Sequence, residues 1–160
     1  MKQYLLVACV FFSFGCVFSQ QYKTAVGLKG GYHFNGGASI GIKHFLKGTT
    51  AIEGIVGGGS NSFWLEGLYE KNATLTDGVE WYWGAGADLG FFTGDYYRTF
   101  NGTKESYSGA FGGLDGVLGV EYTFEDFPLN IALDMGPTLR LFPYVGFSWT
   151  GGIAARFAIK

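Results

Sequence analysis

The chain has 160 residues, is rich in glycine (28 residues) and aromatic residues (19%), and is only 15% charged. Its formal net charge of −2 and the lack of any basic run argue against a nucleic-acid partner. Both cysteines, Cys9 and Cys16, lie near the N-terminus, so the rest of the chain can form no disulfide, thiolate nucleophile or cysteine-based zinc site.

Residues 1–19 have the pattern of a cleaved signal peptide: a positive start, an apolar core over Leu5–Phe12, and small or tolerated residues before a cleavage site after Ser19. The apolar core is shorter than the ~20 residues of a transmembrane helix. A lipoprotein acylated at Cys16 is the alternative, but the preceding residues fit a lipidation site poorly. We therefore expect an exported chain with one mature domain, residues 20–160.

The mature chain alternates between apolar and polar residues with a period of two, which indicates β-strands. The clearest example is 79–92, where the two tryptophans Trp81 and Trp83 share a wholly apolar face and Glu80 and Asp88 lie on the other. No segment shows the 3.6-residue period of an amphipathic helix. The alternation predicts eight strands, near 22–34, 38–46, 50–58, 62–70, 79–93, 107–124, 129–142 and 145–160.

The connections between these strands are too short for crossover helices, which predicts an antiparallel meander. Most are tight turns, such as the one that ends in Asp77-Gly78, and Thr93–Tyr107 is expected to be the longest loop. Pro137 is expected to mark a bulge or a kink. Because closure removes the two exposed edges of such a sheet, the predicted fold is all-β: an eight-stranded antiparallel up-and-down barrel.

The charged residues of the predicted strands fall mostly on one face, while the opposite face is apolar. A soluble barrel would have the reverse arrangement, and a charge on a lipid-facing position costs ~2–4 kcal/mol at the bilayer midplane. We therefore expect a transmembrane barrel whose charges face a closed lumen. The expected lumen residues are Lys29, Lys43, Glu53, Glu66, Glu80, Asp88, Asp115, Glu121, Asp134, Arg140 and Arg156.

The segments 113–124 and 128–134, together with the glycine- and aromatic-rich final strand, resemble the eight-stranded bacterial outer-membrane barrels of the OmpA/OmpX type and small outer-membrane barrel-domain proteins. The resemblance covers the whole mature chain. It implies a location in the bacterial outer membrane, with outer-membrane lipid, lipopolysaccharide and the barrel assembly machinery as partners and no cofactor. It also implies periplasmic termini, so that residues 93–107 face outward.

An eight-stranded barrel is only wide enough to be filled by its own side chains, so the lumen charges are expected to pair into a structural network. Acidic residues outnumber basic ones on this face, so either some carboxylates lie near the rims, with Glu70 and Glu80 as the candidates, or some have raised pKa values. The expected function is a structural or surface-interaction role. The candidate external contacts are Tyr96, Tyr97, Arg98 and Phe100.

Three other functions were weighed. The first is a narrow pore for small solutes or ions. The second is a lipid-modifying enzyme that pairs a histidine with a serine, and the third is a soluble lipid-binding barrel. No residue is assigned a catalytic or metal-binding role, because the sequence has no Gly-x-Ser-x-Gly motif, no His-Ser pair and no metal-ligand spacing. The residues considered for catalysis were His33, His44, Ser39, Ser60 and Ser62.

Overall fold

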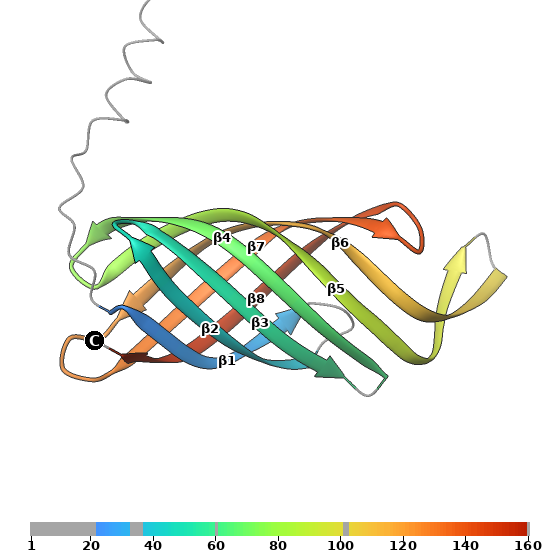
Figure 1. Cartoon of the computed structure of the whole chain (residues 1–160), viewed down its shortest axis with the longest axis horizontal. Helices are drawn as coiled ribbons and strands as arrows, with labels where there is room; N and C mark the ends of the chain where they lie inside the picture. Colours follow the sequence, from blue (N-terminus) through green and yellow to red (C-terminus); the bar gives the residue numbers. More distant parts are fainter. Residues whose placement is uncertain (1–21, 33–36, 60, 101–102, 160) are drawn as a thin grey trace, which may run out of the picture.

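The computed structural model describes residues 22–32, 37–59, 61–100 and 103–159, with the backbone alone for Tyr32 and for residues 93–100 and 103–107. Eight strands follow one another around a single closed sheet (Figure 1). They are β1 (Thr24–Tyr32), β2 (Gly37–Lys47), β3 (Thr50–Gly59), β4 (Ser62–Thr76), β5 (Val79–Phe100), β6 (Thr103–Thr123), β7 (Leu129–Phe142) and β8 (Gly146–Ile159).

Each strand pairs antiparallel with its neighbours in the sequence, and β1 closes the sheet on β8. The closing ladder runs without a break from Thr24 opposite Ile159 to Tyr32 opposite Gly151. The all-β, closed antiparallel barrel predicted from the two-residue alternation is therefore confirmed. We call the end where Tyr22 and Ile159 lie the terminus end, and the opposite end the hairpin end.

The hairpin end differs from the prediction, because the expected long loop Thr93–Tyr107 is mostly β-structure. β5 continues to Phe100 and β6 begins at Thr103, so the two strands pair beyond the barrel wall and project from it (Figure 1). The physical reason is that aromatic and β-branched residues favour extended backbone, and their share in 96–107 outweighs the scattered charges. The Asn-Gly dipeptide at 101–102 is a hairpin signal that the sequence reading did not use.

Two smaller expectations are also corrected. β4 extends to Thr76 instead of ending near residue 70, because residues 71–76 pair with the start of β5. The Asp-Gly turn after it is confirmed, with Gly78 at a φ of 80°. Pro137 causes no change of register. The β6–β7 ladder only lacks the rungs around it, and the register shift lies at Gly112/Gly113.

The strands bury alternate side chains, as the pattern of β7 shows: from Asn130 to Thr138 every even residue is buried and every odd residue is exposed. Inward glycines let the wall curve tightly. A Cβ atom on Gly86 would lie 2.0 Å from the carbonyl oxygen of Gly67 on β4, so only glycine fits there. The outward Gly67, in contrast, has no atom within 4 Å of such a Cβ position.

Candidate functional site: the charged lumen

The structure places the charged residues expected in the lumen on inward positions of the eight strands, where each is buried or half-buried. Eight carboxylates and four cations occupy these inward positions in the described part of the chain. The set comprises Lys29, Lys43, Arg140 and Arg156 together with Glu53, Glu66, Glu70, Glu80, Asp88, Asp115, Glu121 and Asp134.

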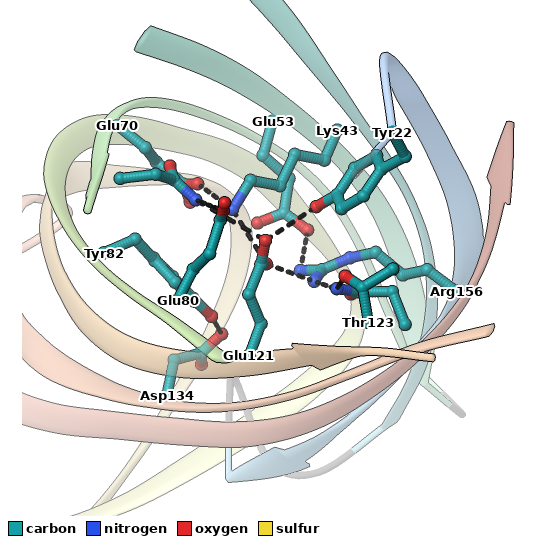
Figure 2. Close-up of polar contacts among 12 residues, drawn as sticks. Tyr22, Lys43, Glu53, Glu70, Glu80, Tyr82, Glu121, Thr123, Asp134 and Arg156 are labelled. Atoms are coloured by element: carbon teal, nitrogen blue, oxygen red, sulfur yellow. Dashed lines mark hydrogen bonds and ion pairs between the residues drawn. The ribbon is translucent and has the colours of Figure 1, made fainter. Parts of the chain in front are cut away.

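Lys43 is the centre of the network in the terminus half of the lumen (Figure 2). Its ammonium lies 2.9 Å from a carboxylate oxygen of Glu70 and 2.9 Å from one of Glu121, and all three side chains are fully buried. The same ammonium lies 4.1 Å from the centre of the Tyr82 ring, a cation–π contact. Because Lys43 is on β2 and Glu121 is on β6, this ion pair crosses the lumen.

Arg156 makes a second crossing from β8. Its Nη2 lies 2.5 Å from Glu53 Oε1 on β3, and its Nη1 donates to Asn130 at 3.2 Å and lies 3.6 Å from Glu121. The two cations thus share Glu121 and, with their other partners, join six strands: β2, β3, β4, β6, β7 and β8. Arg156 hydrogen-bonds to Asn130 and Glu53, and Lys43 hydrogen-bonds to Glu121 and forms an ion pair with Glu70. Several partners for each cation are the condition under which buried charges offset their desolvation.

Tyr22 and Asn72 complete the network at the terminus end. The Tyr22 hydroxyl donates to Glu121 at 2.8 Å, and the Asn72 amide contacts Glu80 and Glu121 at 3.5 Å. Burial and the nearby Glu121 carboxylate raise the pKa of Tyr22 well above its ordinary value of 10.0, so its hydroxyl keeps the proton that it donates. The expectation that Glu70 lies at the rim is wrong, because its side chain is fully buried against Lys43.

Tyr82 separates the two halves of the lumen. Its ring faces Lys43, while its hydroxyl donates to Asp134 Oδ2 at 2.8 Å, on the side of the hairpin end. The same oxygen of Asp134 also accepts from Lys29, 2.8 Å away. The Tyr82 side chain is fully buried, so it forms a layer between the two groups of charges.

The hairpin half of the lumen contains the second group of charges. Arg140 Nη1 lies 2.6 Å from Asp88 Oδ1, and the Thr138 hydroxyl donates to Asp115 at 2.7 Å. The Arg140 guanidinium also lies 4.9 Å from the centre of the Phe111 ring, and that ring packs on Phe92 at 4.6 Å. These contacts lie where β5 and β6 leave the barrel wall.

A cavity of about 30 Å³ lies in the hairpin half, next to the Lys29–Asp134 pair. This volume holds about two water molecules. Much of its wall is glycine backbone, and its polar lining side chains are Lys29, Ser39, Glu66, Asp134 and Thr150.

The residues considered for catalysis do not come together where the structure describes them. His44 lies on the outward face of β2 and is 2.8 Å from the Thr24 hydroxyl, whereas Ser39 points inward and donates to the Lys29 carbonyl. Ser62 is at the start of β4, at the hairpin end. His33 and Ser60 lie outside the described residues. In the described ranges no group of three or more His, Cys, Asp or Glu side chains is arranged to hold a metal ion.

The candidate external contacts Tyr96, Tyr97, Arg98 and Phe100 are in the projecting part of β5, and their side chains lie outside the described part of the structure. The register places Tyr96 opposite Tyr107 and Arg98 opposite Glu105. The structure therefore separates the candidate residues into two groups: the charges inside the barrel and the residues of the projection.

The sequence reading missed the neutral residues that connect the lumen charges, above all Tyr22, Asn72, Tyr82, Asn130 and Thr138. The last four have the same strand parity as the charged residues, and this parity was the available signal.

No protein-family model matches the chain, and no curated protein has significant similarity to it. In the described part of the chain no helix is long and apolar enough to cross a membrane.

Proposed function

We propose that the chain is an integral barrel of the bacterial outer membrane, with a structural role and a surface-interaction role for its projecting hairpin. The observation that carries the proposal is the inversion of polarity in the barrel. The outward positions expose large apolar side chains on all eight strands, such as Leu28 (64%), Leu118 (54%) and Ile153 (61%), while the charges lie inside. Such a continuous apolar surface matches a lipid environment.

The outward aromatic residues support the same proposal, because they gather toward the two ends. β5 has Trp81 near the terminus end and Phe91 near the hairpin end, and β8 has Phe157 and Phe147 in the same places. A strand tilted by ~45° rises about 24 Å over the ten residues from Trp81 to Phe91. This height matches the ~25 Å apolar band between the aromatic girdles of outer-membrane barrels.

A charge introduced on the outward face tests the proposed lipid contact. Leu118→Arg places a cation between the two aromatic bands, and we expect it to lower the stability of the barrel in lipid vesicles by about 2–4 kcal/mol. The measurement is urea unfolding in vesicles, followed by the heat-shifted band on an unboiled gel. Asp126→Arg, at an exposed turn outside the strands, is the control and is expected to leave the stability unchanged.

The result that contradicts the proposal is equally specific. In a water-soluble barrel, Leu118→Arg replaces an exposed apolar side chain by a charged one, and its effect on stability would be small. Wild-type protein that stays monomeric and folded without detergent, together with an unaffected Leu118→Arg variant, would overturn the membrane assignment.

The surface-interaction role rests on the projecting β5–β6 hairpin. β4 stops pairing with β5 at Phe92, and β7 stops pairing with β6 at Gly112, so the hairpin continues with no further barrel strand on either side. An outward orientation of this end follows from the OmpA/OmpX-type resemblance, which places the termini in the periplasm. The charges that cross the terminus half of the lumen count against the alternative of an open pore.

Replacing Tyr96, Tyr97 and Arg98 together by Ala tests the surface role. We expect binding of intact cells to host or abiotic surfaces to fall, because aromatic residues and arginine dominate the energy of contact surfaces. Replacing Thr99 and Ser106 by Ala in the same hairpin is the control. Unchanged binding by the triple variant, with normal surface exposure of the barrel, would remove this role and leave the structural one.

A further inference from the structure

Two aspartates at the base of the projecting hairpin each keep one carboxylate oxygen without a hydrogen-bond partner. Asp88 on β5 and Asp115 on β6 are 5% and 4% exposed, and the residues opposite them are Gly113 and Gly86. Because glycine has no side chain, the two carboxyl groups approach each other across the strand pair. The Oδ2 atom of Asp88 lies over β6, because a Cβ atom built on Gly113 would be 3.1 Å from it.

The existing contacts use only one oxygen of each carboxyl group. Asp88 Oδ1 accepts from Arg140 and Asp115 Oδ1 accepts from Thr138, whereas the Oδ2 atom of each is buried with no donor among the described residues. A buried oxygen without a donor is costly, and two such oxygens on neighbouring carboxylates add mutual repulsion.

Among the described side chains, the carboxyl groups around the pair outnumber the cations that contact them. Arg140 on β7 is the cation in contact with Asp88. Glu66 on β4 faces Asp88 directly in the register and adds a third carboxyl group. On the far side of the lumen, the Lys29 ammonium of β1 contacts Asp134 of β7. Two ionised aspartates beside the single guanidinium would therefore leave an unpaired charge in a buried site.

We propose that Asp88 and Asp115 bind one proton between them at neutral pH. Asp115 carries the proton and donates it from Oδ2 to Oδ2 of Asp88, whose other oxygen accepts from Arg140. This arrangement gives both free oxygens a partner and reduces the charge of Asp88, Asp115 and Arg140 together to zero. A metal ion is the less suitable occupant, because the guanidinium already lies on one of the two ligands.

Because Asp88 and Asp115 lie at the base of the projecting hairpin, the proton that they share affects the packing of this base. Asp88 lies four residues before Phe92, the last barrel residue of β5 paired with β4, and Phe92 packs on Phe111 of β6. Loss of the proton would place two like charges between β5 and β6 just below the projection. The proton therefore holds the base of the hairpin closed at neutral and acidic pH, and alkaline pH loosens it.

Infrared spectroscopy of the detergent-folded protein tests the shared proton, because a protonated carboxyl group absorbs at a higher frequency than a carboxylate. We expect Asp115→Asn to remove one protonated-carboxyl band at neutral pH while the barrel stays folded, since the Asn amide can donate to Asp88 in place of the carboxyl. Asp134→Asn is the control and removes a carboxylate band instead, because Lys29 and Tyr82 both donate to Asp134.

An infrared difference without a protonated-carboxyl component at Asp115→Asn would overturn the proposal. If that variant fails to fold, NMR of isotope-labelled aspartates in the wild-type protein gives the same answer. One carboxyl that keeps its proton at neutral pH supports the shared proton, and aspartates that are all ionised contradict it. These measurements use detergent-folded protein, so their outcome is independent of membrane insertion and of any surface partner.

Discussion

The two halves of the lumen hold similar charges in different ways. In the terminus half, Lys43 and Arg156 are at most 1% exposed and both contact Glu121, so a single connected network crosses the barrel. In the hairpin half, Lys29 and Arg140 are 15% and 14% exposed and contact separate carboxylates. The cavity also lies in the hairpin half.

This difference shows how the number of partners of a buried charge determines the stability that is lost when the charge is removed. Removing one member of the terminus-half network leaves several groups without compensation, because its members share partners and have no access to water. A change in the hairpin half is milder, since the cavity admits water there and the two ion pairs share no carboxylate. The terminus half thus acts as the rigid part of the lumen, and the hairpin half as the adaptable part.

The largest expected effect comes from replacing the two lysines in turn by methionine, which keeps the length of the side chain and removes the charge. We expect Lys43→Met to lower the free energy of unfolding by about 3–5 kcal/mol, because it leaves Glu70 and Glu121 buried beside each other. Lys29→Met should cost about 1.5 kcal/mol, because Asp134 keeps the Tyr82 hydroxyl and borders the cavity. Urea unfolding of the two variants measures both values.

Equal losses for the two lysine variants would break the comparison between the halves. Circular dichroism at low urea serves as the control for folding, because both variants must first show the β-rich spectrum of the wild type. A loss at Lys29 larger than the loss at Lys43 would mean that the hairpin half is the rigid one.

The smallest expected effect comes from Tyr82→Phe, which removes the hydroxyl group and keeps the ring. Asp134 then keeps Lys29 as its partner and Lys43 keeps the aromatic face, so we expect a loss of about 1 kcal/mol. In combination with Lys29→Met the loss should exceed the sum of the two, because both groups donate to one oxygen of Asp134. Additive losses in a double-mutant cycle would show that water replaces these donors.

The two-residue alternation predicted the number and order of the strands, together with the inward position of residues such as Lys43 and Glu121. It could do so because the face on which a side chain lies follows from the pattern within its own strand. It could not predict that these two meet. They are 78 residues apart, and their contact depends on the stagger of the strands around the closed barrel, which no single strand encodes. The rim position expected for Glu70 failed because β4 extends to Thr76, so that Glu70 lies well inside the strand.

The projecting hairpin was missed for a different reason. The scattered charged residues between 93 and 107 favour a loop by their pattern, because a strand with solvent on both faces shows no alternation of apolar and polar residues. Outside the barrel wall, the alternation of apolar and polar residues therefore cannot identify a strand. Only the turn chemistry of the Asn-Gly dipeptide at 101–102 and the β-propensity of the flanking residues remain as signals there.

The glycines of the barrel wall differ in whether they can be replaced by larger residues. Because a Cβ atom at Gly86 would overlap the backbone of β4, while one at Gly67 meets open space, the same amino acid is fixed at one position and free at the other. In a library of all single substitutions, tolerance at these glycines would alternate with strand parity. The many glycines then include two groups: inward ones such as Gly86, which let neighbouring strands approach closely, and outward ones such as Gly30 and Gly67, where a larger side chain meets open space.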